Sequence, residues 1–176
     1  MTVRHIDLKH KMAQIDKSSR HQHIIGKFGE YLLCNWLSRS GFEVAIIDHT
    51  GLDIIAFNPK SRQRMGITVK SRTRNIGKES THVNMFSYRE GKDDRQKLIS
   101  ACTAFGCEPY IAVYVETSQF ADLYLTSLNN YDGKYKIKKV RALDTWKMSV
   151  TWKKQYELDK EVKHIRADFH QDGWTW

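Results

Sequence analysis

The sequence predicts an α/β protein with a mixed central sheet flanked by helices. Apolar residues recur every three or four positions in one early segment, which is typical of an amphipathic helix. In other segments they run without interruption or alternate, which is typical of buried and half-buried strands. Helices on both faces of such a sheet would supply the core. The predicted order is helix, three strands, helix, strand and strand, over residues 24–40, 42–47, 53–57, 65–72, 93–105, 110–116 and 121–127.

The first helix is predicted from a stripe of apolar residues between Ile24 and Ser40, and Gly41 is suited to end it. Gly26 and Gly29 lie within its first turns, where glycine lowers helix stability. Small residues there would let another backbone or a phosphate approach closely. The expected inward stripe is Ile24, Phe28, Leu32, Leu33, Trp36 and Leu37.

The strand after the turn at Asp48–Gly51 begins with an acid. Asp53 is followed by four apolar residues, 54–57, so we expect this strand to be buried on both faces. A buried carboxylate is costly unless it is paired or binds a cation. Asp53 is therefore a candidate functional residue.

The next strand carries a lysine and joins the previous one through turn residues 58–61. Met65, Ile67 and Val69 should share one face of this strand, and Thr68, Lys70 and Arg72 the other. A hairpin would therefore bring Asp53 and Lys70 close together.

The later segments are predicted from the same signals. The helix over 93–105 should bury Leu98, Ile99, Cys102 and Phe105, and Gly106 should end it. We expect one domain with a basic N-terminal arm (1–20), a core (21–128) and a C-terminal β-rich extension (129–176). Apolar residues predict a hairpin in that extension: Val140, Leu143, Trp146, Met148, Val150 and Trp152.

Charge favours a polyanionic partner. The 176 residues include 29 Lys and Arg against 20 Asp and Glu, a net charge of +9 at pH 7. Such an excess favours nucleic acid first, although a basic but inert surface stays open. No apolar run is long enough to span a bilayer, so we expect a cytoplasmic protein without a membrane partner.

Other classes of site receive little support. Cys34, Cys102 and Cys107 lack the spacing of a zinc or redox motif, so reduced thiols are expected. No Gly-x-Ser-x-Gly turn and no phosphate-binding loop ending in Lys-Ser/Thr occurs, which disfavours a serine hydrolase and the use of ATP.

Three segments, GKFGEYLL, GLDIIA and ITVKSR, resemble the PD-(D/E)xK nuclease superfamily, which has the restriction endonuclease-like fold. The pattern is most similar to archaeal Holliday junction resolvases and their relatives, and it covers residues 20–75. The predicted element order matches the αβββαβ core of that superfamily. The resemblance thus implies a restriction endonuclease-like fold for this chain.

The resemblance also implies a catalytic site. Asp53 matches the first acid of the motif, Lys70 the lysine and Glu30 the helix acid, whereas Thr68 stands where the motif has Glu or Asp. Mg²⁺, or Mn²⁺ in its place, would be held by Asp53, the Val69 carbonyl and Glu30. Lys70 would orient or help to deprotonate the attacking water.

DNA is the partner that the resemblance implies, with Lys27, Arg72, Arg74 and Lys78 as the nucleic-acid contacts. The expected function is a Mg²⁺-dependent endonuclease acting on branched or structured DNA, with a homodimer as the expected assembly. Two alternatives stay open: a catalytically impaired nuclease fold that binds nucleic acid or acts in an assembly, and a protein-interaction subunit. Asp48 is a candidate ligand that could compensate for Thr68.

Overall fold

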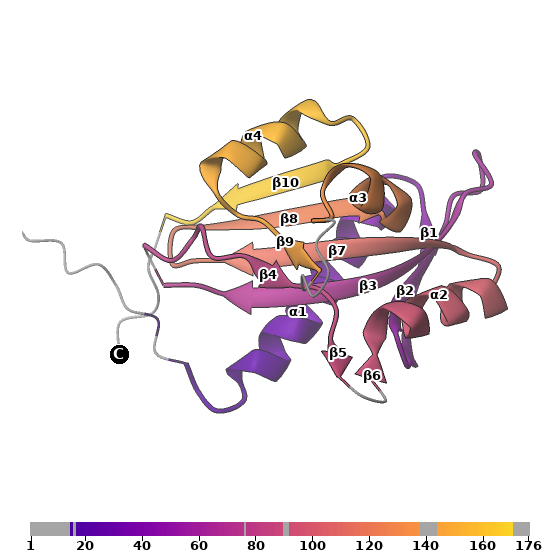
Figure 1. The fold of residues 1–176 in the computed structure, drawn as a ribbon, viewed down its shortest axis with the longest axis horizontal. Helices are drawn as coiled ribbons and strands as arrows, with labels where there is room; N and C mark the ends of the chain where they lie inside the picture. Colours follow the sequence, from indigo (N-terminus) through magenta and orange to yellow (C-terminus); the bar gives the residue numbers. More distant parts are fainter. Residues whose placement is uncertain (1–14, 16, 76, 90–91, 138–143, 171–176) are drawn as a thin grey trace, which may run out of the picture.

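The computed structural model describes residues 15, 17–75, 77–89, 92–137 and 144–170. The predicted stretches at 1–14, 138–143 and 171–176 lie outside these ranges. Six strands form the main sheet, in the order β1-β2-β3-β7-β8-β10 (Figure 1). The elements are α1 (His21–Arg39), β1 (Glu43–His49), β2 (Leu52–Phe57), β3 (Arg64–Thr73), β4 (Val83–Asn84), β5 (Tyr88–Arg89), β6 (Lys92–Asp93), α2 (Asp94–Ala104), β7 (Glu108–Glu116), β8 (Phe120–Ser127), α3 (Leu128–Lys134), β9 (Thr145–Trp146), α4 (Val150–Leu158) and β10 (Lys163–Asp168).

The sheet is mixed, as predicted. β1, β2 and β3 pair antiparallel, β3 and β7 pair parallel, and β7, β8 and β10 again pair antiparallel. A parallel pair needs a crossover connection, and α2 lies in the connection between β3 and β7. Three short strands are inserted before α2. Apart from them, the order α1-β1-β2-β3-α2-β7 confirms the predicted αβββαβ core.

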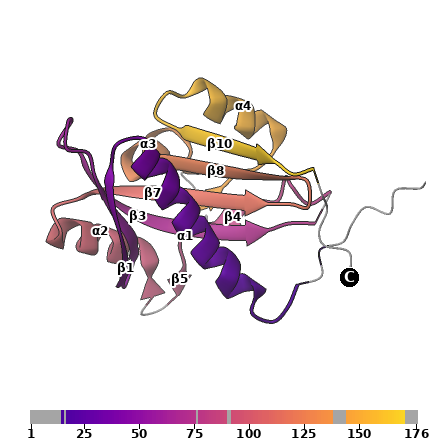
Figure 2. The ribbon, with the colours of Figure 1, turned by 180° about the vertical axis from the view of Figure 1, so that it is seen from behind.

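Helix α1 crosses one face of the sheet (Figure 2). It buries Cys34 and four residues that are spaced four apart: Ile25, Gly29, Leu33 and Leu37. The predicted inward stripe is wrong at its start, because Ile24 is 58% exposed and Phe28 is 49% exposed. The reason is packing: Gly29 faces the sheet, and its missing side chain lets the helix lie close to β3.

The opposite face is covered by α2, α3 and α4. Leu98 and Cys102 of α2 are buried, as predicted, and Asp93 caps the helix by accepting a hydrogen bond from the Gln96 N–H at 2.9 Å. Phe105 is exposed instead of buried and packs edge-on against His49. The segment between β3 and α2 adds three core residues: Val83, Met85 and Phe86.

The C-terminal extension is mixed instead of β-rich, which corrects the prediction for that segment. It contributes α3, α4, the two-residue strand β9 and the sheet strand β10. Trp146 and Met148 are buried and cover the core as expected. Trp152 lies in α4, four positions before Tyr156. This spacing brings both aromatic rings to one helix face, where they pack together.

A buried acid attaches this extension to the sheet. Asp122 in β8 is 0% exposed and accepts hydrogen bonds from Lys153 of α4 at 2.9 Å and from His164 of β10 at 3.0 Å. Arg166 lies 3.6 Å away. Burial by itself raises the pKa of Asp122, but these partners together hold the pKa below its usual value. No pattern in the sequence indicates this cluster.

Two predictions from composition can be compared with the described residues. Within the described ranges, no helix is both long and apolar enough to cross a membrane. Cys34, Cys102 and Cys107 are free thiols. Burial raises the pKa of all three, which is expected for thiols that are not activated.

Candidate active site

Asp53 lies where β2 and β3 separate. The two strands pair as far as Ile54 and Ile67, and Asp53 and Thr68 come next on each side. There the Asp53 side chain replaces the strand partner: its Oδ2 accepts a hydrogen bond from the Val69 N–H at 2.7 Å and another from the Thr68 hydroxyl at 3.1 Å. We call this position the strand fork. These bonds hold the carboxylate in one orientation at the end of the hairpin.

Strand geometry places the next two predicted residues relative to the strand fork. Side chains two apart share a face, so Lys70 lies on the same face of β3 as Thr68. The N–H and C=O of one strand residue point to the same neighbour, so the Val69 carbonyl is directed toward β2 and Asp53. No ion pair between Lys70 and Asp53 occurs among the described residues. Lys70 thus lies two positions after Thr68 on the same strand face, and within the described ranges it makes no ion pair with Asp53.

Glu30 approaches from α1. Its side chain is 12% exposed, and its Oε2 accepts a hydrogen bond from Lys27 Nζ at 2.9 Å. That bond and the charge of Glu30 raise the pKa of Lys27, and Asp48 and Asp53 are close enough to add smaller contributions. Carboxylates from α1, β1 and β2 thus all contribute to the raised pKa of one exposed ammonium group, and Glu30 contributes most.

The donors at the strand fork fit a weakly held hard cation. The described residues contain no group of three or more His, Cys, Asp or Glu side chains that could hold a metal ion. Mg²⁺ keeps several waters, however, and is often bound through one or two carboxylates plus substrate phosphates. The Oδ1 of Asp53 has no hydrogen-bond partner among the described residues. The Val69 carbonyl is directed toward β2, on the side of β3 where Asp53 lies. Thr68 supplies only a neutral hydroxyl.

The predicted nucleic-acid contacts differ in exposure and in hydrogen-bond partners, and Lys27 is paired with Glu30. Lys27 and Lys78 are exposed. Arg72 Nη1 donates to the Ser71 carbonyl at 2.7 Å, and Arg74 Nη2 donates to the His82 carbonyl at 3.0 Å. Because β3 ends at Thr73, Arg74 lies just beyond the strand. Burial, and then repulsion from Arg72, lower the pKa of Arg74.

Sequence reasoning missed a polar network at the far end of β3. The Thr73 hydroxyl donates to Glu116 Oε1 at 2.9 Å, and His21 Nε2 lies 2.7 Å from the same hydroxyl. Lys17 Nζ donates to the Thr73 carbonyl at 2.9 Å. In the sequence His21 is one of two histidines at the start of the first helix, and no spacing links it to Thr73, 52 positions later.

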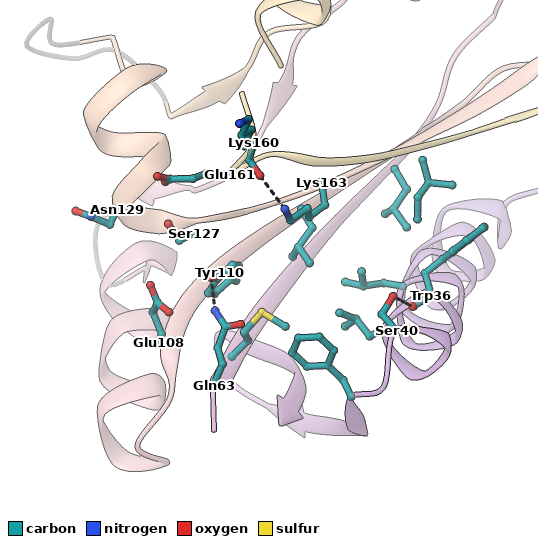
Figure 3. Close-up of a pocket in the computed structure, with 17 residues that line it drawn as sticks. Trp36, Ser40, Gln63, Glu108, Tyr110, Ser127, Asn129, Lys160, Glu161 and Lys163 are labelled. Atoms are coloured by element: carbon teal, nitrogen blue, oxygen red, sulfur yellow. Dashed lines mark hydrogen bonds between the residues drawn. The ribbon is translucent and has the colours of Figure 1, made fainter. Parts of the chain in front are cut away.

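A large cavity lies away from the predicted site. It has a volume of about 730 Å³ and is bounded by the C-terminal half of α1 and by β3, β7, β8 and β10 (Figure 3). Its polar contacts include a bond from Gln63 Nε2 to the Tyr110 hydroxyl at 2.8 Å and one from Lys163 Nζ to the Lys160 carbonyl at 2.7 Å. The predicted site residues lie elsewhere and do not line it.

Comparison with known proteins gives a structural likeness. No family model matches the chain, and no curated protein matches it. Among solved structures, the chain is similar to Hjc, a Holliday junction resolvase of the archaeal hyperthermophile Archaeoglobus fulgidus, with 20% sequence identity and a TM-score of 0.49. The similarity covers 72% of this chain and 85% of that chain.

Proposed function

We propose that this protein is a divalent-metal-dependent endonuclease that hydrolyses phosphodiester bonds in branched or otherwise structured DNA. The observation that carries the proposal is the strand fork. There Asp53 is held by the Val69 amide, with Lys70 next along the strand on the face of Thr68. The sequence resemblance implies this set of groups: a carboxylate in a fixed orientation on one strand, and a lysine and a backbone carbonyl on the next strand.

Each residue of the strand fork has a separate role in this proposal. Asp53 Oδ1 and the Val69 carbonyl would hold Mg²⁺ or Mn²⁺, with Glu30 on the helix side holding a water of its shell. When bound, such a cation lowers the pKa of a water and offsets charge on the phosphate. Lys70 donates hydrogen bonds that orient the attacking water. Thr68 and the Val69 amide keep Asp53 aimed at the reacting phosphate.

A second function is favoured by one observation. The Thr68 hydroxyl and the Val69 amide already satisfy one oxygen of Asp53, so the carboxylate is stabilised without a cation. A protein of this fold that binds nucleic acid without cutting it would need no cation at Asp53. The two functions are separated by whether DNA is cut and by whether metal binds at Asp53.

Cleavage of labelled DNAs tests the proposal. Duplex, single strand, flap and four-way junction would be incubated with Mg²⁺ or Mn²⁺, and with EDTA. We expect metal-dependent cutting that falls by about 100-fold or more in Asp53→Asn and Lys70→Met. Lys60→Met is the matched control, because it removes an exposed lysine from the loop at the other end of the same hairpin. Equal cutting by Lys70→Met and Lys60→Met would refute the assigned site.

Thr68→Glu decides between the two functions if the natural protein cuts nothing. Thr68 is buried against Asp53, so a second carboxylate there needs a cation to offset the repulsion. We expect this variant to melt at a lower temperature without Mg²⁺ and to be stabilised when Mg²⁺ is added. Gain of cleavage would mean a fold that kept its DNA-binding surface while one acid of the site was replaced. Metal binding with no cleavage would favour the binding function.

DNA binding itself is tested by salt. If Z phosphates are contacted, log K should fall with log[salt] with a slope of about −0.9Z for duplex DNA. An affinity that does not depend on salt would favour a protein-interaction subunit instead. We also expect a homodimer, since a four-way junction presents two equivalent strands, and sedimentation equilibrium would test that assembly.

A further inference from the structure

A second basic site lies at the other end of β3. A cavity of about 390 Å³ opens between the chain entering α1 and the last residues of β3. No carboxylate of the described residues lines it. Three of the residues that line it are permanent cations: Lys17, Arg72 and Arg74. A cavity lined by several cations and by no carboxylate of the described residues is suited to an anion.

These cations have no acidic partner in the described part of the chain. No ion pair of Lys17, Arg72 or Arg74 is among the described ion pairs. Their described hydrogen bonds go instead to carbonyl oxygens, of Thr73, Ser71 and His82 respectively. Like charges that gather without a counter-charge destabilise the fold, and a bound anion removes that cost.

The nearest acid is already engaged. Glu116 accepts hydrogen bonds from the Thr73 hydroxyl at 2.9 Å and from the Tyr114 hydroxyl at 3.0 Å. The Thr73 hydroxyl has one hydrogen and gives it to Glu116, so the hydrogen in the 2.7 Å contact must come from His21 Nε2. The Nε2 hydrogen of His21 is thus taken up by Thr73, 3.8 Å from Glu116, and His21 lines the cavity without offering that hydrogen to an anion.

Two polar atoms of residues that line the cavity lack hydrogen-bond partners within the described ranges: the Ser71 hydroxyl and Arg74 Nε. Both atoms are closed off from solvent and therefore lie behind the cavity surface, and Ser71 Oγ is directed at Gly29 of α1. The start of α1 adds positive potential, because its first turn has no acidic residue and Arg20 provides no side-chain cap.

We propose that this cavity binds a phosphate group of a nucleic-acid backbone, held by the side chains of Lys17 and Arg72. The assignment of the ligand to nucleic acid rests on the proposed function, whereas binding of phosphate does not. From Lys70 to Thr73 the strand rises about 10 Å at 3.3 Å per residue. One strand of nucleic acid can therefore contact the strand fork and this cavity together, so that the cavity positions the backbone.

Titration with inorganic phosphate at pH 7.5, against chloride of equal ionic strength, tests the site directly. We expect saturable shifts of backbone amide resonances in residues 17–25 and 71–74. The Lys17→Gln/Arg72→Gln variant should bind at least tenfold more weakly, since a hydrogen bond to a charged group is worth about 1.5–3 kcal/mol. The Lys60→Gln/Lys154→Gln variant has the same net charge, changed at positions away from the cavity, and should bind like the natural protein. Equal binding by both double variants, or no saturable binding at all, would overturn the proposal.

For DNA, the Lys17→Gln/Arg72→Gln variant should lower the salt slope by about 1 for each phosphate that it no longer neutralises. Phosphate binding by the natural protein, with the same DNA slope in the variant, would overturn the assignment to a nucleic-acid backbone.

The two proposals can fail separately. Asp53→Asn should lose cleavage and keep phosphate binding, because Asp53 does not line this cavity. Phosphate binding without any DNA cleavage would count against the nuclease and leave the phosphate site standing. Normal DNA cleavage by the natural protein without phosphate binding would overturn the phosphate site and leave the nuclease proposal standing.

Discussion

Two glycines of α1 should respond in opposite ways to the same substitution. Gly26 and Gly29 are three positions apart, and alanine is favoured over glycine in a helix interior by about 0.8–1.0 kcal/mol. A Cβ at Gly26 would meet nothing within 4 Å among the described residues. A Cβ at Gly29 would lie 2.3 Å from Ser71 Oγ and 3.3 Å from Tyr114 Cβ. Gly26→Ala should therefore stabilise the protein, whereas Gly29→Ala forces α1 away from the sheet.

Both variants replace glycine by alanine in the same helix, so the gain in helix propensity cancels when their free energies of unfolding are compared. Overpacking a well-packed contact costs about 1–3 kcal/mol, so Gly29→Ala should be less stable than Gly26→Ala by about that amount. For a chain of this size, each kcal/mol corresponds to about 2–4 °C in melting temperature. Urea unfolding with an unchanged m-value is the assay, since a changed m-value would signal altered compactness.

The nearest atom can be removed to check the cause. Ser71→Ala deletes the Oγ that the Gly29 methyl would strike, so Gly29→Ala should cost less in that background. The contact with Tyr114 Cβ remains, so the rescue should be partial. Equal stabilisation by Gly26→Ala and Gly29→Ala would refute the packing argument, because it would show that α1 does not need a glycine against β3.

Two further predictions concern buried titratable groups. Asp122→Ala should cost about 3 kcal/mol, the lower end for breaking a buried ion pair, since the cations left behind are partly exposed. The depressed pKa of Asp122 also means that its stabilisation is present above the ordinary value of 3.8 and is lost as pH falls below it; a urea midpoint that is flat from about pH 6 to pH 3 would contradict this. Burial raises the pKa of Cys102 to about 12, so a thiol reagent at pH 8 should modify the less buried Cys107 first and reach Cys102 only on unfolding. Early modification of Cys102, identified by peptide mass, would show that α2 opens more readily than its burial implies.

Local patterns in the sequence were sufficient for the core of the fold. Apart from the short strands β4, β5 and β6, the order of helices and strands through β8 follows from apolar spacing and from turn residues, and both act over a few positions. The hairpin of β2 and β3 was predicted because its residues are close in the chain, with Asp53 and Thr68 15 positions apart. The sequence could not show which hydrogen-bond donors the Asp53 carboxylate would find, because these donors depend on where the two strands separate.

Tertiary packing decided the features that join distant segments. The face of α1 that turns inward depends on Gly29 meeting β3, and no pattern within the helix distinguishes Gly29 from Gly26. In the sequence, Asp122 is a single acid in an apolar strand. Its partners Lys153 in α4 and His164 in β10 are 31 and 42 positions later, and only the fold brings them to it. Charge by itself predicted a polyanion partner. The cavity at the end of β3 exists because Lys17 is folded against Thr73, 56 positions away, and contacts between such distant residues leave no periodic signal in the sequence.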